Sequence, residues 1–467
     1  MSVDAAGLRR RFEEAGQGHV FRFWNDLSPE QQDCLCRQLQ TIDLDWVKRA
    51  GEDLRAGKAG FRFSGELEAA EYIPMTDAPA NKAKARAAGE DLLRRGKVAA
   101  LVVAGGQGTR LGFDAPKGCF PICPISQNSL FQLHAESVLA TGRRYGRPVP
   151  LYIMTSGATD ALTQDYFVRN QFFGLDRDDV RFFVQPMLPA LTADGRLVLE
   201  DRGLVLMSPN GHGGTLGALR DSGMLDDMER RGVEEISYFQ VDNPLVRQVD
   251  PLFVGYHRLA GAQMSSKAIP KRDPEEKLGA FGRQDGRIII VEYSDLTKEQ
   301  MYRRRPDGSL VFGLGSPAMH VINVAFAKRM TRGGLALPFH VAEKAQPVVD
   351  DSGEIVQPQG KNIRKFEMFI FDALRFADAS IIMEVRREDE FSPVKNASGE
   401  DSPATARRDM IARWAAWLDA AGFAVPRGSD GQVSAEIEIS PLFALDAEEL
   451  RAKMPGGRPA EGRLYLA

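Results

Sequence analysis

Cysteine is scarce in this sequence, with four residues among 467, arranged as two close pairs. The pairs are Cys34 with Cys36 and Cys119 with Cys123. Neither spacing matches a zinc knuckle or the redox motif C-x-x-C. The sequence therefore predicts free thiols in a reducing compartment, and no disulfide framework.

Long hydrophobic runs are also missing. The apolar runs at residues 98–104 and 381–383 are far shorter than the stretch of about 20 residues that a membrane helix needs. The first thirty residues mix Arg and Glu with apolar positions and lack the continuous apolar segment of a signal peptide. We therefore expect a cytoplasmic protein that has no membrane partner.

Neither sign of charge dominates, since 60 Lys and Arg stand against 64 Asp and Glu, for a formal charge of -4. This balance provides no overall positive field that could hold a nucleic-acid backbone. Nucleic acid is therefore not an expected partner, and any anionic ligand must be bound by a local site.

The chain is longer than a single hydrophobic core usually supports, and 43% of its residues are hydrophobic. We expect a helical N-terminal region at residues 1–96, a catalytic domain at 97–385 and a small C-terminal domain at 386–467. In the first region, Ser28-Pro29-Glu30-Gln31 provides an N-cap, a proline at the first helical position and a glutamine at the third. In the last region, the pattern predicts a helix at residues 404–421 and a strand at 432–439.

The central region alternates apolar runs with helical patterns. Strands are predicted at residues 98–104, 150–154, 236–241, 287–293 and 320–326, and a helix at 366–376. Near-continuous apolar strands separated by helices are typical of a sheet that is covered on both faces. The fold class is therefore α/β, with a Rossmann-like, mixed and mostly parallel sheet that extends to about Val385.

A glycine-rich loop follows the first of these strands: GGQGTRLG at residues 105–112, with Pro116-Lys117 shortly after it. Closely spaced glycines let backbone N–H groups approach a polyphosphate without Cβ atoms in the way. Arg110 and Lys117 can then meet phosphate charge, Arg as a planar fork and Lys as a point charge. A Walker A loop and the G-x-G-x-x-G dinucleotide fingerprint both fail to fit the spacing.

This string resembles the signature of the sugar nucleotidyltransferases, and more narrowly of the UDP-sugar pyrophosphorylases, which include UDP-N-acetylglucosamine pyrophosphorylases. The resemblance extends from about residue 17 to residue 396. It implies the nucleotidyltransferase fold, UTP and a sugar 1-phosphate as substrates, and a monomer or homodimer. It further implies that the loop binds UTP with Arg110 and Lys117 at the phosphates. The loop residues concerned are Gly105, Gly106, Gly108 and Thr109.

Further strings match the family in the same order. YIMTSG at residues 152–157 resembles its second strand, and QPMLP at 185–189 resembles the segment whose glutamine reads the uracil edge. Gln185 suits that role because an amide donates and accepts at once. PNGHGG at 209–214 implies that the Gly211 backbone touches the base and that His212 lies near the sugar. Amino-sugar enzymes of the family usually have Asn in place of His212, whereas UDP-glucose enzymes have His in a comparable turn.

The remaining candidates lie at strand ends and on the sugar side. Asp242 ends an apolar strand, where α/β sheets place ligands, and the resemblance assigns it to Mg²⁺ and phosphate. The resemblance implies sugar contacts by Glu292, in VEYSD at 291–295, and by Asn323, in INVAF at 322–326. It places Lys365 and Lys395 at the sugar phosphate.

The sequence therefore predicts transfer of the uridylyl group of UTP to N-acetylglucosamine 1-phosphate. No nucleophilic side chain is needed, and Mg²⁺ with Arg110, Lys117 and Lys365 would stabilise phosphate charge. N-acetylgalactosamine 1-phosphate and glucose 1-phosphate remain open as the sugar, as does a non-catalytic UDP-sugar-binding protein. A glycosyltransferase is disfavoured, because Asp242-Asn243-Pro244 lacks the Asp-x-Asp motif.

Overall fold

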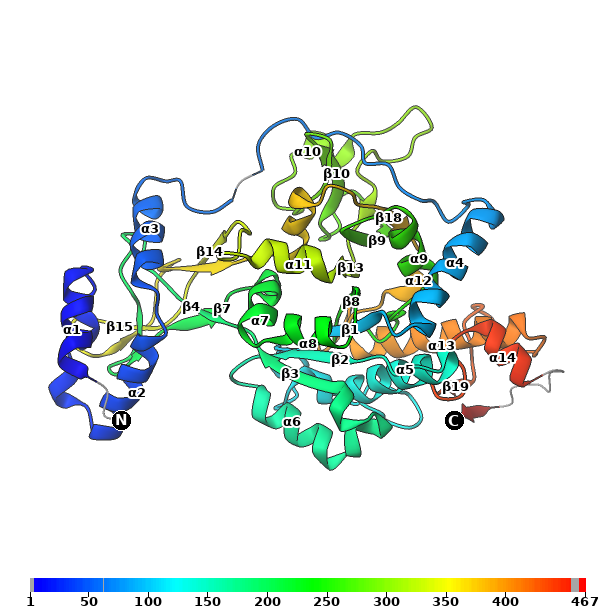
Figure 1. Cartoon of the computed structure of the whole chain (residues 1–467), viewed down its shortest axis with the longest axis horizontal. Coiled ribbons are helices and arrows are strands. Elements are labelled where there is room, and N and C mark those ends of the chain that lie inside the picture. The colour runs from blue at the N-terminus through cyan, green and yellow to red at the C-terminus, as the bar shows by residue number, and fades with distance from the viewer. Residues whose placement is uncertain (1–3, 62, 455–461) are drawn as a thin grey trace. The chain divides into compact units, whose positions relative to one another are not determined.

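The structure is a computed structural model that describes residues 4–61, 63–454 and 462–467. The chain forms two compact units (Figure 1). Unit 1 comprises Met1–Phe63, Gln185–Gly214 and Ala336–Asp372, and unit 2 comprises Ser64–Val184, Thr215–Leu335 and Ala373–Ala467. Both units are assembled from separate stretches of chain, and the linear division into three domains stays a prediction.

Unit 2 contains a ten-stranded sheet with the order β11-β10-β12-β9-β13-β8-β1-β2-β3, and β18 pairs with β9. Its strands are β1 Val98–Val103, β2 Leu151–Thr155, β3 Val180–Val184, β8 Glu235–Gln240, β9 Met264–Pro270, β10 Ala280–Gln284, β11 Arg287–Val291, β12 Leu314–Gly315, β13 His320–Asn323 and β18 Ile382–Glu384. Strands β8, β1, β2 and β3 pair with their neighbours in parallel. Strand β13 pairs antiparallel with β8 and with β9, and β12 joins β9 to the hairpin β10–β11 through antiparallel pairs as well. The α/β class and the mixed sheet are confirmed.

Helices cover this sheet, and a small element follows it. They are α4 Pro79–Arg94, α5 Leu130–Tyr145, α6 Asp160–Arg169, α7 Thr215–Asp221, α8 Met224–Arg230, α9 Pro251–Leu259, α10 Lys298–Tyr302, α11 Val324–Thr331, α12 Arg387–Glu390, α13 Pro403–Ala420 and α14 Ala447–Lys453. The predicted C-terminal helix is confirmed as α13. The predicted strand at 432–439 is shorter, because only β19 Glu436–Ile439 pairs, in parallel, with β20 Arg463–Leu466.

Unit 1 packs three helices on short hairpins. The elements are α1 Ala5–Glu14, α2 Pro29–Gln40, α3 Leu44–Arg55, β4 Met187–Pro189, β5 Leu199–Asp201, β6 Leu204–Val205, β7 Met207–Pro209, β14 His340–Lys344, β15 Val348–Val349, β16 Ile355–Val356 and β17 Ile363–Glu367. The capping box predicted at Ser28 is present, since its side chain accepts from the Gln31 N–H and the Gln31 side chain accepts from the Ser28 N–H. Phe12, Leu35 and Phe366 belong to one buried cluster, which joins the helices to β17.

Two predicted elements are wrong. The helix expected at 366–376 is the strand β17 followed by a 3-10 helix, Ile370–Phe376, because Phe366 pairs with Val341 of β14 and packs on the Trp46 ring at 5.0 Å. The strand expected at 320–326 ends at Asn323. There the Asn323 side chain accepts the Phe326 N–H at 3.2 Å and starts α11.

Helices α4 and α9 cross in very close contact. A Cβ atom on Gly89 would lie 1.9 Å from the Pro251 carbonyl oxygen, and one on Gly255 would lie 1.7 Å from the Ala85 carbonyl oxygen. Only glycine allows the two backbones to approach this far. Because α9 also contacts β9 and β13, the two glycines fix α4 to the sheet unit.

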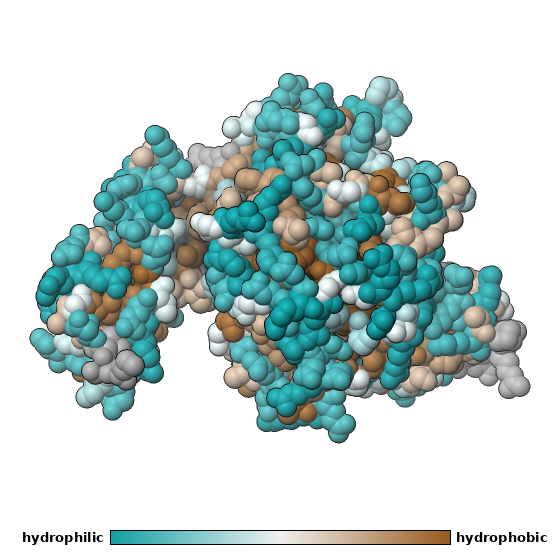
Figure 2. Space-filling view, in the orientation of Figure 1, coloured by the Kyte–Doolittle hydropathy of each residue, from teal (hydrophilic) through white to brown (hydrophobic). Residues whose placement is uncertain are grey.

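Hydrophilic residues cover most of the face that Figure 2 shows. None of the helices in the described ranges is long and apolar enough to cross a bilayer.

Candidate active site

The glycine-rich loop leaves β1 and folds back on itself. The Gly106 carbonyl accepts the Lys117 N–H at 3.0 Å, and the Ala115 carbonyl accepts the Gly108 N–H at 2.9 Å. A Cβ atom on Gly108 would lie 2.8 Å from the Phe113 carbonyl oxygen, so a larger residue has no room there. The closed loop therefore holds Lys117 beside the glycines, as the sequence predicts for a phosphate cradle.

The outer side of this loop carries Thr109 and Arg110, and both are exposed. Within the described part of the chain, the Arg110 guanidinium makes no ion pair and no side-chain hydrogen bond, so its donors can bind an anionic ligand. On the inner side, the Ser156 hydroxyl donates to the Gly105 carbonyl at 2.8 Å. Sequence reasoning noted the string that contains Ser156 but not this contact, which ties the loop to the end of β2.

Lys117 and Asp242 meet at the carboxyl edge of the sheet. The Lys117 Nζ lies 3.2 Å from Asp242 Oδ2, and the two side chains are only 18% and 17% exposed. Asp242 follows β8, the parallel neighbour of β1. The predicted phosphate lysine and the predicted metal carboxylate are therefore neighbours, at the edge where α/β sheets bind ligands.

Asn243 is a buried residue to which the sequence assigned no role. It is 3% exposed, and its Nδ2 donates to the Glu390 carbonyl at 2.7 Å while its Oδ1 accepts the Ser392 N–H at 3.1 Å. The Val394 N–H also donates to the Asp242 carbonyl, at 2.8 Å. Asn243 thus binds the Asp242 turn to the segment that leads into Lys395.

Lys395 lies at the end of that segment. Its Nζ lies 3.5 Å from Asp401 Oδ2 and 5.7 Å from the centre of the Phe391 ring. The lysine side chain is 43% exposed, so this ion pair is weak and a phosphate could compete for the lysine.

His134 supports the same edge from α5. It is 1% exposed, its Nε2 lies 2.9 Å from the Val241 carbonyl oxygen, and the Gln248 amide lies 2.5 Å from its Nδ1. Burial lowers the pKa of His134 to about 4. The ring is therefore neutral at pH 7, with the proton on Nε2 and donated to Val241.

We expect acid to weaken this part of the fold. Below its unfolded pKa of 6.5, His134 takes up a proton in the unfolded chain but not in the folded one. The contribution of His134 to the free energy of unfolding is therefore fully present above pH 6.5. It is lost as the pH falls towards 4, and a pKa shift of this size corresponds to about 3 kcal/mol. Urea unfolding at several pH values checks this, and a His134→Asn variant should lose most of that acid-dependent fall. An equal fall in the variant would contradict the assignment.

Gln185 and Gly211 are brought together in unit 1. The Gln185 Nε2 donates to the Gly211 carbonyl at 2.7 Å, and the glutamine is 7% exposed. Gly211 has a φ of +79°, and a Cβ there would lie 2.4 Å from the Met368 carbonyl oxygen. The turn that presents the predicted base-binding groups therefore requires glycine.

His212 follows this turn and stacks on an aromatic ring. Its ring centre lies 5.3 Å from that of Phe369, with 22° between the planes, and its Nδ1 accepts the Ile370 N–H at 3.2 Å. Burial, and then the charge of His340, lower the pKa of His212 to about 4. The imidazole is therefore neutral at pH 7, with its proton on Nε2.

Lys365 lies in the middle of β17, opposite Ala342 of β14. It is half-buried, on the other face of the strand from Phe366. Within the described ranges, its ammonium group forms no ion pair or side-chain hydrogen bond. Lys365, Gln185, Gly211 and His212 all belong to unit 1, whereas the other predicted site residues belong to unit 2.

Glu292 follows β11 and is half-buried. Through β10 and β12, the register places Val291 level with Ile269, near the end of β9. Strands β9 and β8 are both antiparallel to β13, so they run in the same direction. Glu292 therefore lies at the end of the sheet where β8 leads into Asp242. Burial lowers the pKa of Lys271, against the attraction of nearby carboxylates that include Glu292.

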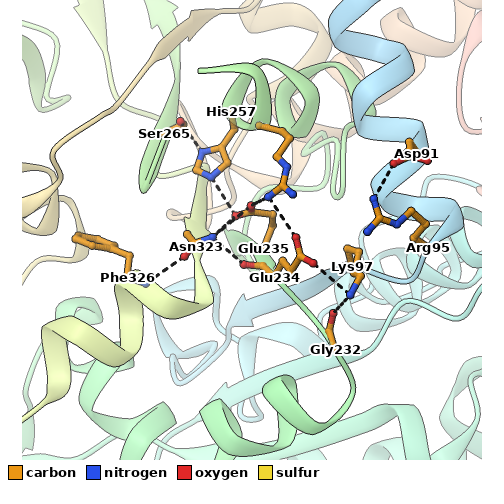
Figure 3. A network of polar contacts seen from close by, with 11 residues as sticks. Asp91, Arg95, Lys97, Gly232, Glu234, Glu235, His257, Ser265, Asn323 and Phe326 are labelled. Carbon is orange, nitrogen blue, oxygen red and sulfur yellow. Dashed lines mark hydrogen bonds and ion pairs between the residues drawn. The ribbon is translucent and has the colours of Figure 1, made fainter. Parts of the chain in front are cut away.

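Asn323 lies at the opposite edge of the sheet from Asp242. It pairs with Glu235, the first residue of β8, whereas Asp242 lies beyond the last residue of that strand. Figure 3 shows Asn323 turned towards Glu235, which accepts at 3.0 Å from the buried His257 ring. Asn323 caps α11 and belongs to this buried network, so the structure does not bring it to the candidate site.

Residues 66–401 match the family model described as UTP–glucose-1-phosphate uridylyltransferase. This chain belongs to that uridylyltransferase family. Its UDP-sugar pyrophosphorylase relatives include the human UDP-N-acetylhexosamine pyrophosphorylase-like protein 1, which is 38% identical over 96% of this chain and 94% of its own. The UDP-N-acetylglucosamine pyrophosphorylase of Saccharomyces cerevisiae is 32% identical over 92% of this chain and 95% of its own.

The family fold is seen in a solved structure as well. The crystal structure of the uridine diphosphate N-acetylglucosamine pyrophosphorylase from Trypanosoma brucei, in complex with inhibitor, has a TM-score of 0.84 and 28% identity. It covers 100% of this chain and 98% of its own. The match in fold, together with the full-length identity above, confirms the UDP-sugar pyrophosphorylase family that the glycine-rich loop predicted.

Proposed function

We propose that this uridylyltransferase transfers the uridylyl group of UTP to N-acetylglucosamine 1-phosphate, with Mg²⁺, and releases pyrophosphate. The observation that carries this proposal is the contact of Lys117 with Asp242 beside a closed glycine-rich loop. A cation and a carboxylate at the end of parallel strands suit a nucleotide that arrives with a metal ion. Relatives named as pyrophosphorylases of N-acetylated hexosamine nucleotides support the sugar.

The chain's own residues would act by positioning and by neutralising charge. A phosphate oxygen of the sugar 1-phosphate forms a bond to the α-phosphorus of UTP, and the bond from that phosphorus to pyrophosphate breaks. The attacking oxygen is already an anion, so no side chain has to remove a proton. Arg110 and Lys117 donate to the phosphates of UTP, and Lys395 meets the sugar phosphate.

The donor set fits a magnesium ion that arrives with the nucleotide. Within the residues that the structure describes, no group of three or more His, Cys, Asp or Glu could hold a metal ion. Mg²⁺ is commonly bound by one or two carboxylates together with substrate phosphates, and Asp242 supplies such a carboxylate. When bound, the ion would supply Lewis-acid stabilisation of phosphate charge.

One observation favours glucose 1-phosphate as a second candidate. His212 presents a neutral imidazole where amino-sugar members of the family usually have Asn. We therefore propose to measure pyrophosphate release from UTP and Mg²⁺ with N-acetylglucosamine 1-phosphate and glucose 1-phosphate side by side. Faster turnover of the acetylated sugar supports the proposal, and faster turnover of glucose replaces it. Binding of UDP-sugars without turnover of either would identify a non-catalytic binding protein.

A His212→Asn variant tests the contribution of this residue. An Asn carbonyl can accept the Ile370 N–H in place of Nδ1, so the turn should persist. We expect the ratio of kcat/KM for the two sugars to move towards the acetylated one by about tenfold. His19→Asn serves as a control, because His19 contacts the Leu197 carbonyl instead. An unchanged ratio would remove His212 from sugar selection.

A further inference from the structure

Unit 2 contains a cavity of about 370 Å³ that none of the predicted site residues lines. Helices α5 and α13 form one side, and residues 439–447 close another. The remaining wall consists of residues 244–251, which follow Asp242 and Asn243, and residues 386–390, which precede Lys395. The cavity is therefore separate from the candidate active site but shares its supporting segments.

The carboxylates of this cavity already have cationic partners. The pairs are Asp446 with Arg144, Asp389 with Arg386, and Glu390 with Lys267, at 2.7, 2.6 and 2.6 Å. No carboxylate on the wall is therefore left to neutralise a further cation, and a cationic ligand would meet an unfavourable site.

Two arginines of the same wall, Arg413 and Arg247, have no carboxylate at such a short distance. Among the described residues, Arg413 forms no ion pair. Its Nη1 donates to the Leu245 and Asp389 carbonyls, at 2.8 and 3.3 Å, and its Nε is buried without a hydrogen-bond partner. Burial lowers the pKa of Arg413 to about 10, since the surroundings disfavour its charge. An anion beside the guanidinium group would offset the cost of burying its charge.

Arg247 has only long contacts. Its nitrogen atoms lie 3.5 Å from Asp446 and 3.7 Å from Asp250, and each of these carboxylates has a closer cation. Those closer cations are Arg144 at 2.7 Å and Lys267 at 2.9 Å. Two guanidinium groups therefore line one cavity and have N–H donors that close carboxylates do not occupy.

The rest of the lining is aromatic and aliphatic. The Trp417 ring lies 5.4 Å from the Arg413 guanidinium, and Trp414 and Tyr145 also line the cavity. Flat rings suit an aromatic ligand, because offset stacking and contact with a guanidinium plane add to the burial of apolar surface.

We propose that this cavity binds a small aromatic anion, a carboxylate or a phosphate ester, whose ring packs against Trp417 and whose oxygens accept from Arg413 and Arg247. The size of the cavity suits a molecule of one or two rings. Arg413 also holds the carbonyl of Leu245, two residues beyond Asn243. Occupancy therefore acts on the turn that carries Asp242, and the ligand and UTP alter one another's affinity reciprocally.

Ligand-observed fluorine NMR with the full chain tests binding. The probes are 4-fluorobenzoate and 4-fluorophenyl phosphate, each measured both without UTP and with saturating UTP and Mg²⁺, and uncharged 4-fluorobenzyl alcohol is the comparison. We expect line broadening with a Kd of about 1 mM or below for at least one anion, and at least tenfold weaker binding of the alcohol. Equal binding of the alcohol, or no anion binding, overturns the proposal.

Variants locate the binding. Arg413→Gln should weaken anion binding about tenfold, because it removes a charged donor. Ala416→Phe fills the cavity and keeps every arginine, so it should abolish binding even if Arg413→Gln disturbs the fold. Ala412→Phe adds the same bulk to an exposed position of α13 outside the cavity and should bind normally. Normal binding by Ala416→Phe would place the anion elsewhere, and an unchanged UTP affinity in the presence of the probe would overturn the coupling.

Discussion

Replacing Lys117 by methionine is expected to lower the rate of pyrophosphate release by about 100- to 1,000-fold. The variant removes the charge that we propose to act on the phosphates of UTP, and it leaves Asp242 half-buried without its cation. Because this charge would stabilise the phosphates during transfer of the uridylyl group, the variant should lower kcat more than it raises KM. Steady-state kinetics with UTP and Mg²⁺ measures the two parameters.

Lys97 offers a matched control for this variant. It precedes β1 at the opposite edge of the sheet, is half-buried, and pairs with Glu234 at 3.2 Å (Figure 3). Lys97→Met removes an ion pair of the same length outside the candidate site, so its rate should stay within about twofold of the wild type. In the double variant Lys117→Met, Asp242→Asn, the rate should fall by less than the product of the two single-variant factors, because the two residues are in contact. Full additivity of the two changes in a folded protein would contradict a shared role.

Gly255→Ala is expected to destabilise the fold by about 3 kcal/mol, although alanine is a better helix former than glycine. The new Cβ would lie 1.7 Å from the Ala85 carbonyl oxygen, so α4 and α9 would have to move apart. Urea unfolding, read as a shift of the midpoint, measures this loss.

Gly217→Ala in α7 is the control for this prediction. A Cβ at Gly217 would meet only Leu335, at 3.6 Å, which is ordinary van der Waals contact. The variant should be as stable as the wild type, or more stable by up to about 1 kcal/mol. Similar losses in the two variants would show that the close helix crossing is not the cause.

The sequence predicted the parts that a local pattern determines. Strands β1, β2 and β8 are buried on both faces, so apolar runs identify them directly. Their shared direction then brings Lys117 and Asp242 to one edge. The glycine-rich loop is likewise a contiguous string, and its spacing alone excludes the two better-known phosphate and dinucleotide loops.

Pairing between distant segments decides the features that the sequence could not predict. The residues around Asn323 do not reveal the direction of their strand. The strand pairs antiparallel with β8, and this register places Asn323 at the opposite edge of the sheet from Asp242. Residues 363–376 are rich in aromatic side chains that fit a helix or a strand, and the choice depends on β14 and Trp46. The Gly89 and Gly255 contact has no local signal either, because the residues are remote in sequence.

The composition of unit 1 has a consequence for the order in which the protein is made. Its buried cluster combines Leu8 and Phe12 of α1 with Leu197 and with Phe366, which come from three separate stretches of chain. The ribosome delivers the last of them roughly 300 residues after α3, about 15 to 60 s later at ordinary translation rates. During that interval the apolar faces of α1 to α3 lack the cover that Phe366 of β17 provides. Because both units are built from separate stretches, neither can be released as an independent fragment by cutting the chain once.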